Sequence, residues 1–176
     1  MSKAPASALP RKRGQRNGVQ IDVIVRSPRW RKRPTAKTVV KKAVCAAAKA
    51  VSTPRAELAI VLTDDSTIQA LNRDWRGKNA PTNVLSFPAA DPGKARAASP
   101  YIGDIVIAYQ TVAREAVADG KPFNHHLAHL AVHGFLHLLG HDHDTDRDAD
   151  KMERLERKIL KRLAIPNPYA PRDAQP

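Results

Sequence analysis

The stretch His133-Gly-Phe-Leu-His137-Leu-Leu-Gly140-His-Asp-His143 determines how the rest of this sequence is interpreted. His133 and His137 lie one helical turn apart, so their imidazoles leave the same face of a helix, about 6 Å apart along its axis. Gly140 can end that helix in a left-handed conformation, and the chain can then turn back toward the pair with His143. Three neutral imidazoles leave the fourth position of a tetrahedral metal open, as in catalytic zinc sites. The spacing therefore predicts a three-histidine metal site.

A structural zinc site is the main alternative for these histidines. Structural sites usually close with four protein ligands and favour cysteine, but the only cysteine, Cys45, lies far away in the sequence. An isolated helical histidine is more often a core or surface residue, yet all seven histidines of the chain lie between residues 125 and 143. This concentration favours a metal site of the catalytic type.

The third ligand is less constrained than the first two. His129 extends the ladder of four-residue steps, but a straight helix places it about 12 Å from His137, too far for one shared ion. A residue beyond the turn can converge on the pair, so His143 is the predicted third ligand and His141, two residues nearer, is its competitor. The two remaining histidines are expected to be exposed near the start of the helix: His125 and His126.

The residue after the first predicted ligand argues against a peptidase. In HExxH metallopeptidases a glutamate at this position acts as the general base. The corresponding residue here is Gly134. A metallopeptidase-like hydrolase therefore requires a base from elsewhere in the chain.

The excess positive charge is confined to the N-terminal end. The chain of 176 residues has a net charge of +13, and residues 1–42 hold thirteen Lys or Arg against one acid, Asp22. Two dense clusters, 11–16 and 29–33, predict binding to a polyanion, with nucleic acid as the preferred partner. Trp30 adds an aromatic ring to the second cluster. A solubilising tail and a membrane-surface patch are the alternatives.

Composition predicts one folded domain between two tails. Residues 1–18 contain too few apolar side chains to fold and are expected to form a disordered basic arm. Residues 19–169 are expected to form the domain, and residues 170–176 a C-terminal tail. No apolar run approaches the roughly 18 residues of a membrane helix, and a single cysteine fits a reducing compartment. We therefore expect a cytoplasmic protein with no membrane partner.

Hydrophobic periodicity predicts an α+β fold, a single domain with one roughly four-stranded sheet packed with about five helices. The predicted strands are 20–25, 56–63, 83–87 and 102–108. The predicted helices are about 35–52, 66–75, 109–118, 123–139 and 147–163. Asp64 and its neighbours are expected to cap the second helix. The metal site lies at the end of the central helix, and residues 89–100 are expected to form a flexible loop.

The metal motif resembles the signature of the YbeY family of bacterial endoribonucleases. Two further segments are similar to that family, LNRDWRGKNAPTNVLSFP at 71–88 and GDIVI at 103–107, and the similarity extends over roughly residues 20–169. It implies one zinc ion per chain, held by His133, His137 and His143, and a functional arginine at Arg76. Asn83 stands where the family often has Asp.

The same resemblance implies a substrate and a cellular role. It implies a single-strand-specific endoribonuclease that matures the 3′ end of 16S rRNA and acts in ribosome quality control in the bacterial cytoplasm. The implied partners are ribosomal RNA and the small ribosomal subunit, with a ribosomal protein or a GTPase as a further candidate. A ribosome-assembly factor with a structural zinc is the non-enzymatic alternative.

Hydrolysis of an RNA phosphodiester needs a nucleophile and neutralisation of the charge on phosphoryl oxygens. A three-histidine zinc lowers the pKa of water to near 7, and Arg76 would supply bidentate hydrogen bonds. Asp142, beside a predicted ligand, is a candidate to orient a histidine. Asp104 is a second candidate acid, although an aspartate on a strand is as often a structural acceptor.

Overall fold

Four strands form one mixed sheet in the order β1-β2-β4-β3. The computed structural model describes residues 18–53, 55–89, 100–141 and 145–170. The strands are β1 (Gly18–Val25), β2 (Arg55–Thr63), β3 (Val84–Pro88) and β4 (Tyr101–Ala108). Strands β1, β2 and β4 are parallel, whereas β3 is antiparallel to β4 and forms one edge of the sheet.

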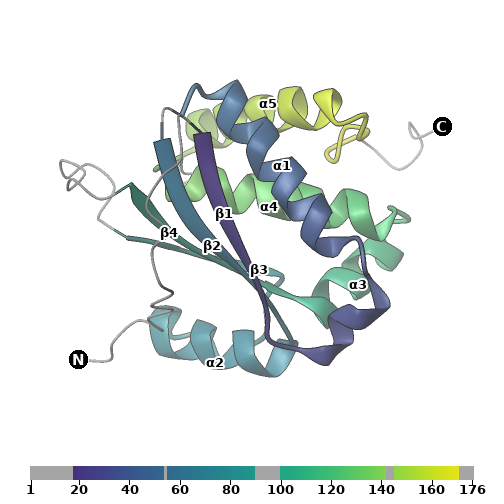
Figure 1. Ribbon diagram of the computed structural model, residues 1–176. Helices are drawn as coiled ribbons and strands as arrows, with labels where there is room; N and C mark the ends of the chain where they lie inside the picture. The colour runs from purple at the N-terminus through teal and green to yellow at the C-terminus, as the bar shows by residue number, and fades with distance from the viewer. Residues whose placement is uncertain (1–17, 54, 90–99, 142–144, 171–176) are drawn as a thin grey trace.

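The helices cover both faces of this sheet (Figure 1). They are α1 (Ala36–Ala50), α2 (Asp65–Arg76), α3 (Tyr109–Ala118), α4 (Phe123–Leu138) and α5 (Asp146–Arg162). Helices α1, α4 and α5 lie over one face and α2 lies alone over the other, while α3 follows β4 at the end of the sheet. The three parallel strands require crossovers, and α1 supplies the one between β1 and β2.

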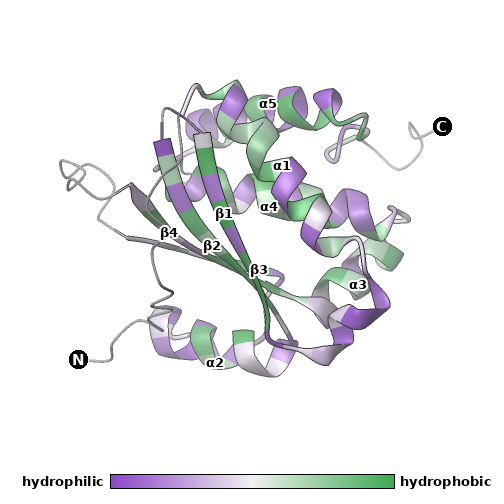
Figure 2. Cartoon of the chain, in the orientation of Figure 1, coloured by the Kyte–Doolittle hydropathy of each residue, from purple (hydrophilic) through white to green (hydrophobic). Residues whose placement is uncertain are grey.

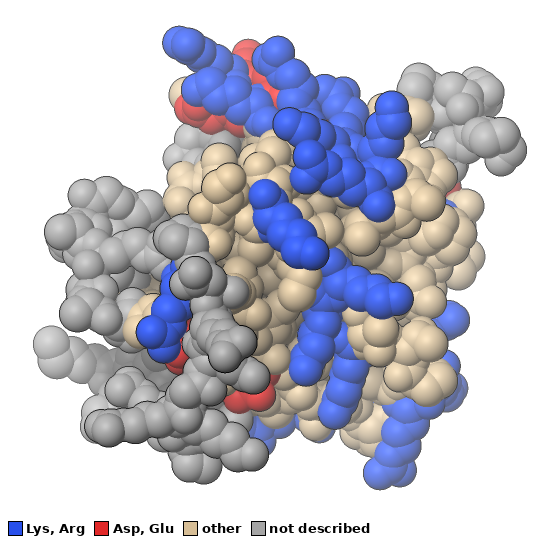
Figure 3. Space-filling model, turned by 45° about the horizontal axis from the view of Figure 1, so that its top comes forward, with Lys and Arg blue, Asp and Glu red and all other residues tan. Residues whose placement is uncertain are grey.

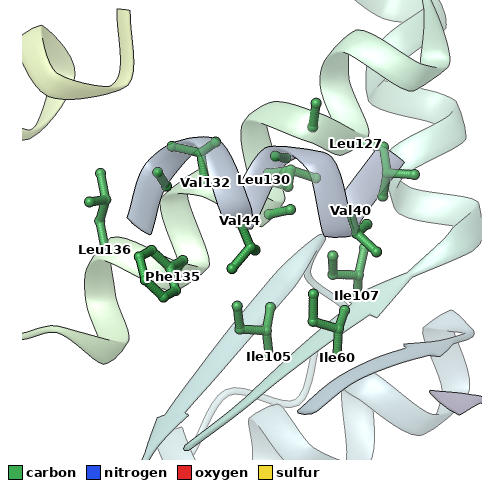
Figure 4. Close-up of a cluster of buried hydrophobic side chains, with 14 of the residues drawn as sticks. Val40, Val44, Ile60, Ile105, Ile107, Leu127, Leu130, Val132, Phe135 and Leu136 are labelled. Carbon is green, nitrogen blue, oxygen red and sulfur yellow. The ribbon is translucent and has the colours of Figure 1, made fainter. Parts of the chain in front are cut away.

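The main core lies between the sheet and helices α1 and α4. Figure 4 shows apolar side chains of these two helices above apolar side chains of β2 and β4. Ile105 and Ile107 of β4 belong to this core, whereas Val106 and Ala108 belong to a smaller core under α2. This alternation follows from the two-residue period of a strand, and Figure 2 shows both hydrophobic and hydrophilic positions along the strands and the helices.

Helix α4 is the central helix of the molecule. It is buried along most of its length, and only one stripe of histidines breaks its apolar surface. Position 134 faces β3 and β4, where a Cβ atom would lie 2.9 Å from Ile105 Cγ2 and 3.1 Å from Ser86 Oγ. Glycine therefore allows α4 to pack closely against the sheet, and the Ser86 hydroxyl donates a hydrogen bond to the Gly134 carbonyl at 3.1 Å.

The predicted α+β fold is confirmed, with four strands and five α-helices in the described parts of the chain. Asp64 caps α2 as expected, because its Oδ1 accepts from the Thr67 amide at 3.1 Å. The hydrogen bond from the Ser66 hydroxyl is the largest cause of the lowered pKa of Asp64. A short 3₁₀ helix, η1 (Pro28–Lys32), was not predicted. Residues 1–17 of the predicted arm and the interior of the predicted loop at 89–100 lie outside the described residues, and Gly18, the last residue assigned to the arm, begins β1.

The interpretation of Trp30 as part of a polyanion-binding cluster is wrong. Its side chain is only 3% exposed, and its indole N–H donates to the Thr63 carbonyl at 2.8 Å. The ring packs edge-on against Tyr109 and Phe123, with centroids 5.3 and 6.0 Å away. Burial of an aromatic ring with a satisfied N–H contributes to the core, so the charges of η1 are at the surface but its tryptophan is not.

Candidate metal centre

The end of α4 has the turn that the sequence predicts. Gly140 has a φ of +87°, and its N–H donates to the His137 carbonyl at 3.0 Å. The next N–H, of His141, donates to the Leu136 carbonyl at 3.1 Å. These two bonds form a Schellman motif, in which a left-handed glycine satisfies the last carbonyls of a helix. The chain therefore leaves α4 directly after the histidine pair.

His133 and His137 converge on one point. Their Nε2 atoms lie 3.1 Å apart, and their ring centroids are 4.5 Å apart at an interplanar angle of 77°. An ion bound to imidazole nitrogens at about 2.0–2.1 Å can be shared by two atoms at this separation. The donor set and its convergence thus fit zinc, and the expected position of the pair at the end of the central helix is confirmed.

A buried glutamate from α5 holds one of these rings. Glu156 is 0% exposed, and its Oε1 lies 2.8 Å from His133 Nδ1. Burial would raise its pKa, but hydrogen bonds from His129 and His133, the charge of His129 and a hydrogen bond from Tyr169 lower it to about 2. Glu156 is therefore ionised at neutral pH and can only accept hydrogen bonds.

The ionised Glu156 determines the tautomer of His133. Because the carboxylate only accepts, Nδ1 of His133 must carry the proton that it shares with Glu156. In a neutral imidazole the other nitrogen is then unprotonated, and this Nε2 is directed toward His137. Carboxylates commonly fix metal-binding histidines in this way and raise their basicity.

His129 has a different role from the two convergent histidines. Its Nε2 lies 3.0 Å from Glu156 Oε2 and 3.2 Å from the Tyr169 hydroxyl. Tyr169 also donates its hydroxyl to Glu156. The nitrogen of His129 that faces the carboxylate is a donor, so His129 supports Glu156 instead of extending the ligand set. His129 was predicted from its helical spacing not to share an ion with His137, and its contact with Glu156 agrees with that prediction.

A second carboxylate binds the first histidine of the stripe. His126 Nε2 lies 2.7 Å from Glu115 Oε2, and the Asn83 amide donates to the same carboxylate at 2.9 Å. Burial raises the pKa of Glu115, but the hydrogen bonds from His126 and Asn83 outweigh it, and the net pKa is lowered. His126 is only 8% exposed, so its predicted exposure is wrong. His125 is partly exposed in the first turn of α4.

The structure does not bring Arg76 directly to the histidine pair. Arg76 ends α2, on the opposite face of the sheet from α4 (Figure 1). The two faces meet at the edge strand β3, where Phe87 contacts the ring of Trp75 at 5.6 Å and Ser86 contacts α4. Within the described residues, the exposed guanidinium of Arg76 has no hydrogen-bond or ion-pair partner.

Asp104 lies on the same face of the sheet as α2. Its side chain leaves β4 on the same face as those of Val106 and Ala108, which pack under α2. Asp104 is paired with Phe87 across the β3–β4 ladder. Burial raises the pKa of Asp104, although a hydrogen bond of 2.6 Å from the Tyr101 hydroxyl lowers it. The other two acidic or ligand candidates, Asp142 and His143, lie outside the described residues.

Comparison with known proteins identifies the family of the chain. The family profile described as Endoribonuclease YbeY matches residues 26–164. The chain belongs to this family. An "Endoribonuclease YbeY" of Nitrobacter hamburgensis is 54% identical over 157 residues, which cover 86% of this chain and 83% of the relative. A namesake of Rhodopseudomonas palustris is 54% identical over 155 residues, covering 86% and 82%.

A solved structure has the same fold. The solution structure of TM1509 from Thermotoga maritima has a TM-score of 0.51 to this chain, at 20% identity, and covers 86% of this chain and 100% of that one. The family membership predicted from the three motifs is thereby confirmed by sequence, and the YbeY-like α+β architecture by structure.

Sequence reasoning missed the residues that hold the histidines of the candidate metal centre. Glu156 belongs to α5, far along the chain from the histidine motif. A signal for it was present, because Glu156 falls on the apolar stripe of α5 with Met152, Ile159 and Leu160. A charged residue on such a stripe is buried against a partner, and the histidines were the available partners. Tyr169 and Glu115 had no comparable signal.

Proposed function

We propose that this protein is a single-strand-specific, zinc-dependent endoribonuclease that matures the 3′ end of 16S rRNA. Membership of the Endoribonuclease YbeY family supports the activity. The observation that carries the proposal is the pair of imidazole nitrogens 3.1 Å apart, with one ring held by an ionised, buried carboxylate. The curated relatives are bacterial, and the bacterial cytoplasm is the proposed location.

His133 and His137 would hold the zinc ion, with His143 as the third ligand. Bound zinc supplies a Lewis acid that lowers the pKa of water and stabilises charge on a phosphoryl oxygen. Glu156 keeps His133 in the tautomer that binds a metal, and His129 and Tyr169 keep Glu156 in place. The chain thus orients the site before a substrate arrives, which lowers the cost of reorganisation during the reaction.

Arg76 would bind the phosphate backbone of the substrate strand. Its guanidinium offers a planar set of donors that match phosphate oxygens. An RNA strand that crosses the β3 edge would contact the α2 face at Arg76 and the α4 face at the histidines.

An extended basic surface supports ribosomal RNA as the substrate. From residue 23 to residue 56 the chain has ten Lys or Arg and no acid. The exposed side of α1 carries Lys37, Lys41, Lys42 and Lys49, and Figure 3 shows basic side chains gathered over α1 and α5. The exposed positions of α1 have no bulky apolar residue, which a membrane-surface helix would need. No helix in the described residues is long and apolar enough to cross a bilayer.

Neither alternative has a comparable structural basis. A peptidase of the HExxH type needs a glutamate at position 134, where a Cβ atom would already press on Ile105. A ribosome-assembly factor with a structural zinc would cleave no RNA, with or without the ion. Both alternatives therefore predict that zinc-reconstituted protein has no ribonuclease activity.

Cleavage of an RNA with the 3′ end of 16S rRNA tests the proposed function. Metal-free protein, zinc-reconstituted protein and the His133→Ala variant are compared on that RNA, free and on small ribosomal subunits. We expect cleavage only by the zinc-reconstituted wild type. His125→Ala, on the same helix but outside the contacts with Glu156, is the matched control and should cleave normally. Equal cleavage with and without zinc, by protein of verified metal content, would refute zinc dependence.

A further inference from the structure

One tryptophan of the two lies at the surface, beside the proposed substrate arginine. Trp75 occupies the last turn of α2 and is 47% exposed, whereas Trp30 is 3% exposed. The Trp75 ring is supported from one side by Phe87, with centroids 5.6 Å apart at an angle of 68°. A large ring held by an edge-on neighbour keeps its orientation while much of its surface stays accessible.

The surroundings of Trp75 contain further aromatic rings and an arginine. Across the β3–β4 ladder, Phe87 is paired with Asp104, which accepts a hydrogen bond from the hydroxyl of Tyr101, itself 39% exposed. Arg76 follows Trp75 directly, and within the described residues its guanidinium has no partner. The left-handed Gly77, with a φ of +68°, ends α2 immediately after it. The exposed rings of Trp75 and Tyr101 and the guanidinium of Arg76 therefore lie on the α2 side of the sheet.

We propose that Trp75 stacks on a nucleobase of the single-stranded RNA substrate, while Arg76 binds the adjacent phosphate. This inference rests on the proposed function and adds a substrate-binding residue to it. A base can stack on a side chain only where it is not enclosed in a duplex, and aromatic stacking with a nearby cation is the usual way to bind single strands. Trp75 thus gives a physical basis for preferring single strands over duplexes.

In this arrangement both sides of β3 contact the same RNA strand. Trp75 and Arg76 hold a base and a phosphate on the α2 face, and α4, the helix that carries the histidine pair, contacts β3 from the opposite face through Gly134. Stacking on Trp75 fixes the register of the strand, because a base that is stacked cannot slide past the edge without unstacking.

Tryptophan fluorescence tests the proposal directly. Wild-type protein in a chelating buffer is titrated with a single-stranded RNA octamer and with the same sequence as a blunt duplex. Quenching by the single strand is expected to report Trp75, because Trp30 is buried. In Trp75→Leu, which can still cover Phe87, we expect quenching to disappear and octamer affinity, measured by fluorescence anisotropy of a labelled RNA, to fall about 5- to 150-fold. Trp75→Phe should retain most of the affinity because it keeps an aromatic face.

A matched control and a second readout separate this inference from its alternatives. Val117→Ser, at an 82% exposed apolar position on α3, should bind the octamer as the wild type does, and thermal unfolding verifies the fold of every variant. Folded Trp75→Leu with wild-type octamer affinity, or equal quenching by octamer and duplex, would overturn the proposal and assign Trp75 to another kind of contact. If zinc-loaded wild type cleaved 16S rRNA normally in that case, the proposed function would stand. If the wild type bound the octamer through Trp75 but its zinc-loaded form cleaved no RNA, the proposed endoribonuclease function would be refuted instead.

Discussion

Replacing Glu156 with glutamine should weaken zinc binding without removing any ligand. The carboxylate accepts from His133 at 2.8 Å and from His129 at 3.0 Å, and also from Tyr169. A carboxamide has one acceptor oxygen and an NH₂ group that only donates. One of the two histidines must therefore face a donor. If His133 faces the NH₂ group, it can accept a hydrogen bond only as the tautomer that is protonated at Nε2, and Nε2 is the atom proposed to bind the metal.

The expected loss of zinc affinity follows from the replaced contact between Glu156 and His133. Partners that orient a metal-binding histidine typically contribute 10- to 100-fold in affinity, which corresponds to about 1.4–2.7 kcal/mol at 25 °C. Zinc affinity of Glu156→Gln should fall by this amount, as measured by competition with a chromogenic chelator of known affinity. Glu156→Ala is less informative, because it removes the acceptor of three partly exposed donors at once and empties a fully buried position, so it would destabilise the fold itself.

A neighbouring carboxylate provides the control for this experiment. Glu153→Gln changes the same functional group one turn earlier on α5, and Glu153 is partly exposed. It should retain wild-type zinc affinity. A folded Glu156→Gln variant with unchanged zinc affinity would show that the tautomer of His133 is fixed by something other than Glu156, and the argument from the ionised carboxylate would be wrong.

Four further outcomes are expected. His143→Ala should lose stoichiometric metal by elemental analysis, and loss in His141→Ala with full metal in His143→Ala would reverse the choice of third ligand. Arg76→Ala should lose RNA cleavage but retain its metal and melting temperature, because its guanidinium has no partner in the described residues; a large drop in melting temperature would contradict this. Deletion of residues 1–18, which removes five basic side chains, should make the log–log salt dependence of RNA binding shallower by roughly 0.7 per lost phosphate contact, and an unchanged slope would exclude the arm from RNA binding. The pKa of Glu115 is lowered in the fold, so its carboxylate stabilises the protein above the pKa of about 4.3 of the unfolded chain, and this stabilisation is lost as pH falls through the folded value. The free energy of unfolding of Glu115→Gln should therefore decline less in acid than that of the wild type. An identical decline in denaturant titrations would contradict the assignment.

The sequence predicted those parts of the site that depend on local spacing. His133 and His137 follow from helical periodicity, and the turn at Gly140 follows from the cost of a left-handed backbone for other residues. Strands and helices were also found, because their periods of 2.0 and 3.6 are visible in the sequence. The support from Glu156 was not, since it depends on how α5 packs on α4, a contact between segments more than twenty residues apart.

Errors in the sequence analysis have the same physical origin. Trp30 stands in a run of charges, and His126 stands at a helix start beside His125, so local context predicted exposure for both. The fold buries Trp30 against Tyr109 and pairs His126 with a carboxylate from α3. In each case a tertiary partner satisfies the polar atom that local reasoning assigned to solvent.

The roles of the histidines along α4 therefore depend on carboxylates as well as on histidine spacing. Glu115 binds His126, and Glu156 binds one nitrogen of both His129 and His133. His129 presents Nε2 to Glu156, whereas His133 presents Nδ1, so only His133 can direct an unprotonated Nε2 toward His137. An otherwise regular ladder of imidazoles is thus divided into two convergent rings, which we propose as metal ligands, and two other rings, because an ionised carboxylate accepts a hydrogen bond from whichever nitrogen the helix turns toward it.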